Sequence, residues 1–410
     1  MEVPSPIEVG LKAKGIGPKG LRPIERETLE GIINQLTNGE VSEELVGAFL
    51  MGFRVLEKDQ DQLLLLEDVL RANSSYLSPS LLSVSAKIGE GSPEGPWVWV
   101  SDLKKGVELS SEVCRQIVDF LIDPDEDAVV KAALLQGLRV KRETDNENAA
   151  LYGRLMEICP VHQSNFPLIV DISEPYDGMS RNDNLSLELG VVLSLAGVKV
   201  VLHGVKNLGP KYGKGILSRV DESIACNYAL AQSSLKEVGL AILDQRHVWP
   251  EFHSLLQLRN RIKKRPFLAT VEKMLMPLRG EKNLLVTGYV HRAYRESIPA
   301  MLRSNGIDSY LLFKGLEGGV QLRGGGECTV YFEGGGSLRH ENFFVDKDGE
   351  EVSWSEDSGI LGTAEAILKF GLGSSGGDRR ITDMKSMMVD GRFREKLAQI
   401  RKFYPEPNVG

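Results

Sequence analysis

The sequence predicts an α/β fold in which a mostly parallel sheet is flanked by helices, together with a smaller all-helical domain that is duplicated at the N-terminus. Two observations support this prediction. Short apolar runs rich in β-branched residues alternate with helix-forming segments between residues 166 and 345, which is the pattern of parallel strands joined by crossover helices. Before them, a set of amphipathic helical segments occurs twice. The expected parts are a flexible arm (1–22), a first helical module (23–95), a linker with the second helical module (96–165), the α/β domain (166–345) and a C-terminal helical tail (346–410).

The helical repeat is visible as identical residues in one register. Ala48 aligns with Ala133 and Gly52 with Gly137, at a constant offset of 85 residues. Chance similarity between amphipathic helices is the alternative, but identical residues of several types in one register argue against it. Between the two copies, the segment GEGSPEGPWVWVSD is rich in Gly and Pro and contains one short aromatic strand-like piece, so we interpret it as a linker.

The central segment predicts a βαβ unit. PLIVDI, which begins at Pro167, and KVVLHG, which begins at Lys199, are predicted buried strands, and the apolar helix-forming run Leu185–Ala196 connects them. Ligands of such units bind beyond the carboxyl ends of the strands. Two loops are expected at that edge, Ser173–Asp183 and Gly204–Gly215. Strand and helix patterns continue to alternate after this unit, and Gly-rich turns from residue 324 predict an antiparallel addition to the sheet.

The composition is that of an ordinary globular protein, with 42% hydrophobic and 26% charged residues. The formal net charge of -8 disfavours nucleic acid as a partner, because proteins that depend on phosphate contacts are usually basic. The four cysteines lie far apart and show no metal-ligand spacing, which indicates reduced structural thiols. No apolar run reaches membrane-spanning length and no targeting segment is recognisable. We therefore expect no membrane partner and a cytoplasmic location.

Several motifs in order resemble the anthranilate phosphoribosyltransferase family. They are the repeated helical unit, D-I followed by D-G and N-x-S, a strand ending in H-G, R-x5-R, and KGLEGG, and they cover roughly residues 100–330. The resemblance implies a helical domain, an α/β domain and an active site between them. It also implies transfer of phosphoribose from phosphoribosyl pyrophosphate to a small aromatic acceptor such as anthranilate, with Mg²⁺ as cofactor, and a homodimer that forms through the helical domain.

The pyrophosphate loop of the family is changed here. The family has D-I-x-G-T-G-G-D-G, whereas this chain has Asp171-Ile172-Ser173-Glu174-Pro175-Tyr176-Asp177-Gly178. The closing Asp177 and Gly178 remain as candidate phosphate contacts, and the glycines of the cradle are replaced. Glycine lets backbone N–H groups approach a phosphate, while Pro175 has no N–H and Glu174 would repel an anion.

Further phosphate contacts are implied by position. The family's N-I-S-T helix start matches Asn184 and Ser186, where a helix N-terminus favours an anion. The family's K-H-G-N-R matches the residues from Leu202 to Lys206, with His203 as a candidate catalytic residue. The alternative for His203 is a structural histidine at the end of a strand. Candidate phosphate-binding lysines of the following glycine-rich loop are Lys206, Lys211 and Lys214, and a solvated loop is the alternative there.

The acceptor and metal contacts are implied in the same way. Arg259, the first arginine of R-x5-R, matches the residue that faces the anthranilate carboxylate, and the alternative is one basic residue on a solvated helix face. The family's G-L-D-E supplies an acidic pair for Mg²⁺, and here it reads Gly315-Leu316-Glu317-Gly318. Glu317 is the remaining carboxylate, and Asp177 is the candidate second ligand.

Three functions follow from these residues. The first is a phosphoribosyltransferase of the tryptophan-biosynthesis type. The second is a catalytically inactive relative that binds nucleic acid or another anionic ligand, because one branch of the family carries a Y-x-G-x-R-like loop in place of the glycine loop and binds nucleic acid. Tyr176-Asp177-Gly178-Met179-Ser180-Arg181 resembles that replacement. The third is an assembly protein whose duplicated helical module only holds subunits together.

Overall fold

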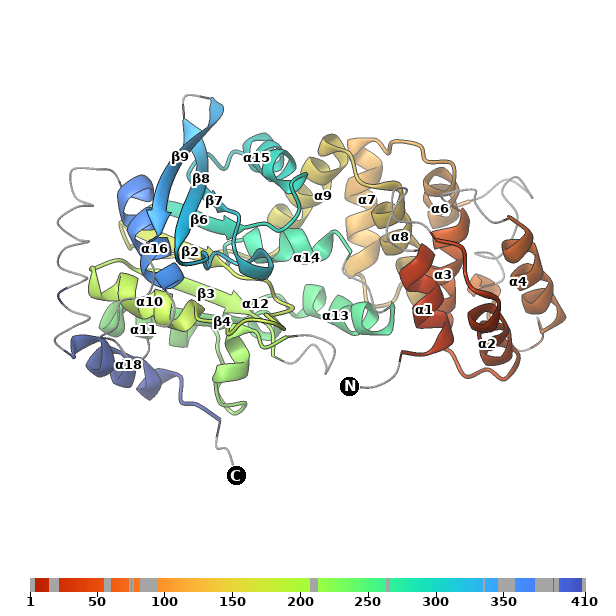
Figure 1. Ribbon diagram of the computed structural model, residues 1–410, viewed down its shortest axis with the longest axis horizontal. Helices are drawn as coiled ribbons and strands as arrows, with labels where there is room; N and C mark the ends of the chain where they lie inside the picture. Colours follow the sequence, from red (N-terminus) through yellow and green to blue (C-terminus); the bar gives the residue numbers. More distant parts are fainter. Residues whose placement is uncertain are drawn as a thin grey trace. The chain divides into compact units, whose positions relative to one another are not determined.

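The computed structural model describes residues 4–14, 22–54, 60–73, 75, 77–81, 94–206, 213–262, 266–334, 336–345, 358–372, 386 and 391–407 (Figure 1). The chain divides into two compact units. The first comprises Met1–Leu155 and Glu251–Leu268, and the second comprises Met156–Pro250 and Ala269–Gly410. The segment 251–268, expected inside a continuous α/β domain, therefore belongs to the helical unit.

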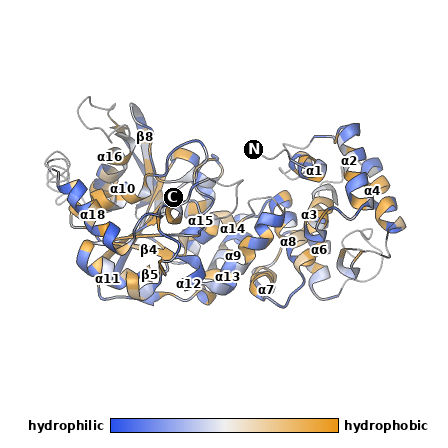
Figure 2. Cartoon of the chain, turned by 90° about the horizontal axis from the view of Figure 1, so that it is seen from below, coloured by the Kyte–Doolittle hydropathy of each residue, from blue (hydrophilic) through white to orange (hydrophobic). Residues whose placement is uncertain are grey.

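The first unit is built from helices, whose cores form where their apolar faces meet. They are α1 (Pro6–Lys14), α2 (Arg26–Thr37), α3 (Glu43–Arg54), α4 (Gln60–Ala72), α6 (Pro96–Lys104), α7 (Ser111–Ile122), α8 (Ala128–Lys141), α9 (Asp145–Ile158) and α13 (Pro250–Ile262). Helices α3 and α8 pack against each other, and α8 is buried along nearly its whole length. Polar and apolar stretches alternate along α2 and α4 (Figure 2), as expected of helices with one face in a core.

The helices keep the offset of the sequence repeat. Helices α7, α8 and α9 each begin 85 residues after α2, α3 and α4, respectively. One side-chain contact is also repeated at this offset: Gln62 Oε1 accepts a hydrogen bond from the Ile24 N–H, and Glu147 Oε1 accepts one from the Leu109 N–H. The correspondence supports an internal duplication, which we keep as a proposal.

Two local predictions were wrong. The expected flexible arm (1–22) contains the helix α1, in which Ile7 and Leu11 are buried against neighbouring helices. The strand-like aromatic piece of the expected linker is the helix α6, which begins at Pro96. Proline is well suited to the first turn of a helix because its φ is already near the helical value and its missing N–H would have no partner there. High Pro and Gly content hid both helices.

The second unit contains the predicted mostly parallel sheet. Its strands are β2 (Leu168–Ser173), β3 (Val200–Gly204), β4 (Leu240–Asp244), β6 (Lys282–Gly288), β7 (Tyr310–Phe313), β8 (Gly326–Gly334) and β9 (Ser337–Val345), in the order β4-β3-β2-β6-β7-β8-β9. The first five of these are parallel, and the hairpin β8–β9 is antiparallel. A small parallel pair joins β1 (His162–Gln163) to β5 (Leu278–Arg279). The α/β fold class is thereby confirmed.

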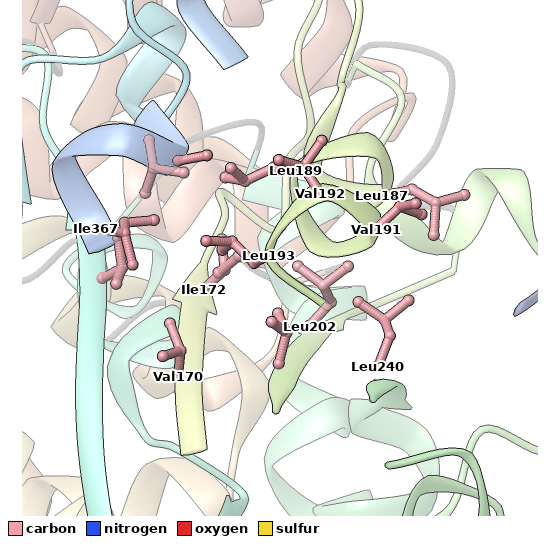
Figure 3. Packing of buried hydrophobic residues seen from close by; sticks show 14 of the residues in the cluster. Val170, Ile172, Leu187, Leu189, Val191, Val192, Leu193, Leu202, Leu240 and Ile367 are labelled. Carbon is pink, nitrogen blue, oxygen red and sulfur yellow. The ribbon is translucent and has the colours of Figure 1, made fainter. Parts of the chain in front are cut away.

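Helices surround this sheet and enclose its main core. They are α10 (Ser186–Leu195), η2 (Ile216–Arg219), α11 (Tyr228–Val238), α12 (Gln245–Val248), α14 (Leu268–Val271), η3 (Glu272–Met274), α15 (Tyr294–Ser304), η4 (Leu316–Gly318), α16 (Ser358–Ala366), η5 (Ile367–Gly371) and α18 (Arg392–Phe403). Leu193 of α10 faces Ile172 of β2 and Ile367 of η5 (Figure 3). Helix α10 also packs against α16 and α18.

The expectations from composition concerned the cysteines and membrane-spanning helices. All four cysteines are free, and burial raises the pKa of Cys114 and of Cys226 to about 12, so both thiols are protonated at neutral pH. Within the described ranges, every helix is too short or too polar to cross a bilayer.

Gly190 sets how closely α10 approaches the sheet. A Cβ at this position would lie 2.2 Å from Leu240 Cδ1. We expect Gly190→Ala to lower the free energy of unfolding by about 1–3 kcal/mol through overpacking, whereas glycine to alanine in an unhindered helix raises it. Urea denaturation measures this. The control is Gly326→Ala, because a Cβ there would meet nothing within 4 Å. Stabilisation by Gly190→Ala would contradict this account of the packing.

Candidate functional site

The loops that follow β2, β3, β6 and β7 meet at the carboxyl ends of these strands. The backbones of Met179 and Lys214 exchange two hydrogen bonds, which join the loop after β2 to the loop after β3. Gly178 (φ 68°) sits against this second loop, and a Cβ on it would lie 2.3 Å from the Lys214 carbonyl carbon. Similarly, a Cβ on Gly288 would lie 1.8 Å from the Gly319 carbonyl oxygen. These glycines permit the close approach of the four loops, at the edge where the topology predicts a ligand site.

A buried chain of hydrogen bonds fixes the loop after β2. Val170 and Ile172 face the core with α10, so Asp171 points to the opposite side of the sheet, and His203 on β3 points to that side too. His203 Nε2 lies 3.1 Å from Asp171 Oδ1, and His203 Nδ1 lies 2.5 Å from Tyr176 Oη. All three side chains are buried.

The partners assign the protons in this chain. Burial raises the pKa of Tyr176 well above its usual value, so its hydroxyl is protonated and donates to His203 Nδ1. The other ring nitrogen then carries hydrogen and donates to the Asp171 carboxylate. Trp249 packs edge-on against the His203 ring at 6.4 Å between centroids, and its Nε1 donates to the Pro160 carbonyl. His203 is therefore a satisfied structural histidine in this conformation, the alternative that the sequence left open.

A second buried polar group lies beside the first. Glu174 Oε1 accepts a hydrogen bond from the Val320 N–H, and a Cβ on Gly319 would lie 2.3 Å from Glu174 Oε2. Lys273 Nζ donates to the carbonyl oxygens of Gly288 and Gly318, at 2.8 Å each. Burial raises the pKa of Glu174 and lowers that of Lys273 to about 8. Glu174 thus joins the loop after β2 to the loop after β7, and Lys273 of η3 joins the end of β6 to the loop after β7.

Glu317 occupies the exposed end of the loop after β2. Its Oε2 accepts from the Ser180 N–H (2.9 Å) and Ser180 Oγ (3.0 Å). Its Oε1 accepts from the Arg181 N–H (2.8 Å), the Asn182 N–H (3.0 Å) and Asn182 Nδ2 (2.9 Å). Burial would raise the pKa of Glu317, but these hydrogen bonds outweigh it and lower the pKa to about 2. The backbone of Glu317 is left-handed (φ 47°, ψ 20°), which costs about 1–2 kcal/mol for a residue with a Cβ.

The helix start predicted to hold phosphate is formed as expected. Asn184 Oδ1 accepts from both the N–H and the hydroxyl of Ser186, at the first turn of α10. Asn184 Nδ2 donates to the Lys214 carbonyl. Both side chains are buried, and in this conformation they hold the loops together. Whether they also contact a ligand stays a prediction.

The predicted lysines are not gathered around one point. Lys206 Nζ donates to the Asp221 carbonyl at 2.6 Å, so that ammonium group holds a neighbouring loop. The Lys214 side chain is exposed. Lys211 lies outside the described residues. Arg259 is buried on α13 of the first unit, not on a solvated face. Its predicted contact with an acceptor stays a prediction.

The described residues do not form a ready metal site. Glu317 has both carboxylate oxygens engaged by loop donors, and Asp177 is buried, where its charge interacts with Lys273. Within the described residues no group of three His, Cys, Asp or Glu side chains is arranged to hold a metal ion. The predicted pair Glu317 and Asp177 thus does not fit Mg²⁺ in this conformation, since a carboxylate ligand needs a free oxygen.

The sequence did not single out Lys273. It lies in the segment VEKMLMP, which carries no recognisable motif. Its partners are backbone carbonyls of residues 15 and 45 positions away, and such contacts leave no pattern in the sequence.

Similar proteins are found by sequence, although no family model matches the chain. An anthranilate phosphoribosyltransferase of Prochlorococcus marinus is 24% identical over 284 residues, which cover 68% of this chain and 81% of that protein. An uncharacterized protein of Aquifex aeolicus is 25% identical over 218 residues, which cover 52% of this chain and 65% of that protein.

Solved structures show the same fold. The anthranilate phosphoribosyltransferase of Thermus thermophilus aligns with a TM-score of 0.55 at 19% identity, covering 74% of this chain and 98% of that one. The enzyme of Saccharomyces cerevisiae in complex with PRPP and Mg aligns with a TM-score of 0.58 at 14% identity, covering 75% and 97%. The fold class is thus that of the phosphoribosyltransferases which pair a helical unit with a mostly parallel α/β unit. In sequence, the chain is similar to anthranilate phosphoribosyltransferases at about a quarter identical residues over two thirds of its length.

Tyr176→Phe tests the buried chain. The substitution leaves His203 Nδ1 buried without its donor, so we expect the free energy of unfolding to fall by about 1–3 kcal/mol. Chemical denaturation measures it. Tyr294→Phe on α15 is the matched control, because its ring is in contact with His291 and its hydroxyl has no hydrogen bond to any of the residues that the structure describes. Equal stability of Tyr176→Phe and the wild type would contradict the role given to this hydroxyl.

The low pKa of Glu317 predicts a pH dependence. A carboxylate whose pKa in the folded protein lies near 2, below its ordinary value of 4.5, contributes stability above pH 4.5 and loses it as the pH falls towards 2. We expect the stability difference between the wild type and Glu317→Gln to shrink over that window in denaturation at stepped pH. A difference that stays constant down to pH 2 would contradict the hydrogen-bonded carboxylate.

Proposed function

We propose that this protein is a phosphoribosyltransferase that transfers phosphoribose from phosphoribosyl pyrophosphate to an aromatic amine such as anthranilate, a reaction of the tryptophan-biosynthesis type. The observation that carries the proposal is the combined similarity in sequence and fold to anthranilate phosphoribosyltransferases, one of which is solved in complex with PRPP and Mg. The proposed place of the donor is among the loops at the carboxyl ends of β2, β3, β6 and β7, because ligands of parallel sheets bind at this edge.

The reaction is a displacement at the anomeric carbon. The acceptor nitrogen forms a bond to this carbon, the bond to the pyrophosphate oxygen breaks, pyrophosphate leaves with the electron pair, and the nitrogen releases a proton. Positioning and neutralisation of the leaving group supply most of the catalysis. Asn184 and Ser186 at the start of α10 and the exposed Lys214 are the proposed phosphate contacts, and Arg259 is proposed to orient the acceptor carboxylate. Mg²⁺, when bound, would neutralise charge on the pyrophosphate, but Glu317 and Asp177 as they are placed here do not fit it.

The changed loop limits where the pyrophosphate can be held. Glu174 and Tyr176 fill the loop after β2 with buried side chains, where the family has glycines. A phosphate cannot approach those backbone N–H groups as it would approach glycines. The proposal therefore relies on donors further along the loop and on Lys214.

Calorimetry with phosphoribosyl pyrophosphate and Mg²⁺ tests the donor site, and a fluorescence assay of anthranilate consumption tests transfer. We expect saturable heat in the wild type and about tenfold weaker binding in Lys214→Ala, because one charge-assisted phosphate contact is lost. The control is Lys236→Ala, which removes an exposed lysine of α11. Absence of heat at millimolar donor would reject the transferase.

A second candidate function is supported by the filled loop itself. A relative without turnover that binds nucleic acid or another anion would need no open pyrophosphate cradle, and the packing of Tyr176 on His203 agrees with this. The basic residues available to it are reduced, since Lys206 is bonded to a carbonyl and Arg261 Nη1 lies 2.6 Å from Glu44. Gel-shift assays at low and moderate salt distinguish the two functions. No shift even at low salt removes this candidate.

The assembly and the location belong to the same proposal. We propose a homodimer formed through the helical unit and a cytoplasmic location, as the resemblance and the sequence composition suggest. Light scattering of the purified chain tests the dimer, and a monomer at micromolar concentration would reject it.

A further inference from the structure

Three backbone N–H groups in a row converge on one carboxylate. The N–H groups of Ser180, Arg181 and Asn182 all point to Glu317, and the Ser180 hydroxyl and the Asn182 amide complete a set of five donors. Successive N–H groups that face one point form the type of concave anion site found in phosphate-binding loops. The loop is thus built around an anion, and in this conformation the protein supplies the anion itself.

The surroundings allow an external anion to reach the same place. Ser180, Arg181 and Asn182 are exposed, and Glu317 is half-buried, so the donors are not sealed in a core. Arg181 also carries a positive charge in this exposed loop, which favours the approach of an external anion.

The segment that carries Glu317 is suited to release it. Glu317 holds a left-handed backbone that is unfavourable for a residue with a Cβ. Gly318 and Gly319 follow it directly and Gly315 precedes it by two residues. The backbone that follows is held in place, because Lys273 Nζ donates to the Gly318 carbonyl and Glu174 accepts from the Val320 N–H. Rotation of the Glu317 side chain about its own bonds is therefore the way for the carboxylate to leave the loop, and it leaves β7 intact.

We propose that Glu317 regulates this loop: as an internal anion on the backbone amides of Ser180–Asn182, it blocks the binding of a phosphate group there until a ligand displaces it. The ligand class is inorganic phosphate, pyrophosphate or the phosphate group of a larger molecule. The inference rests on the donor site of the proposed function but not on turnover, because inorganic pyrophosphate alone is sufficient to occupy the site.

The two roles of Glu317 have opposite consequences. If Glu317 were a Mg²⁺ ligand, as its position in the motif implies, removal of its carboxylate would weaken anion binding, and only when the metal is present. If Glu317 is a blocking anion, removal of its carboxylate strengthens the binding of the external anion, and no metal is required. The sign of the change therefore separates the two roles.

The experiment is a titration of the full-length protein with inorganic pyrophosphate in a buffer that contains a metal chelator. Calorimetry measures the affinity, and amide NMR of the isotope-labelled protein locates the bound anion. We expect Glu317→Ala to bind pyrophosphate at least about tenfold more tightly than the wild type, with amide shifts at Ser180, Arg181 and Asn182. The control Glu327→Ala removes an exposed carboxylate of β8, with the same change in net charge, and should bind like the wild type.

Binding by Glu317→Ala that equals or falls below that of the wild type would overturn the inference. So would amide shifts that occur only outside the loop. Glu317→Gln keeps the side-chain volume and removes the charge, so it serves if the alanine variant does not fold, and it should also bind more tightly. Tight pyrophosphate binding without transfer to anthranilate would reject the proposed function and leave this site standing.

Discussion

The hydrogen-bonded chain of Asp171, His203 and Tyr176 is the interaction on which the candidate site depends. It ties β2 and β3 together across the face of the sheet that is opposite to α10, and it holds the loop after β2 inward. Each member is buried and has a polar partner, which makes the chain rigid and costly to open. Because Tyr176 points inward, the loop can present only its later residues to solvent.

The consequence is a displaced arrangement of anion-binding groups. In the family motif, glycines directly after the first strand approach the pyrophosphate. Here the buried side chains of Glu174 and Tyr176 occupy that space, and the buried ammonium group of Lys273 lies close enough to Glu174 to interact with its charge. The N–H groups later in the loop donate to Glu317. The backbone donors at Ser180–Asn182 are those that remain accessible from solvent. Under the proposed function, an anion would be held by these later donors and not by the residues that directly follow β2.

Much of the fold followed from the sequence, because it depends on local patterns. The apolar runs PLIVDI and KVVLHG are β2 and β3, and Leu185–Ala196 is α10 within one residue at each end. The helices α1 and α6 were missed because proline and glycine obscured their periodicity. The hydrogen-bond partners at the site were harder to predict from the sequence. Glu317 lies 137 residues from Ser180, and the Lys273 ammonium group donates to backbone carbonyls. Contacts between distant loops depend on the assembled sheet and leave no spacing in the sequence.

The most direct test of this account is a crystal structure of the wild-type protein with inorganic pyrophosphate and without metal. The account predicts a phosphate group on the backbone N–H groups of Ser180, Arg181 and Asn182, with the Glu317 side chain turned away and the Tyr176–His203 hydrogen bond intact. Pyrophosphate bound instead at an opened loop between Glu174 and Gly178, with Glu317 still on the amides, would contradict it.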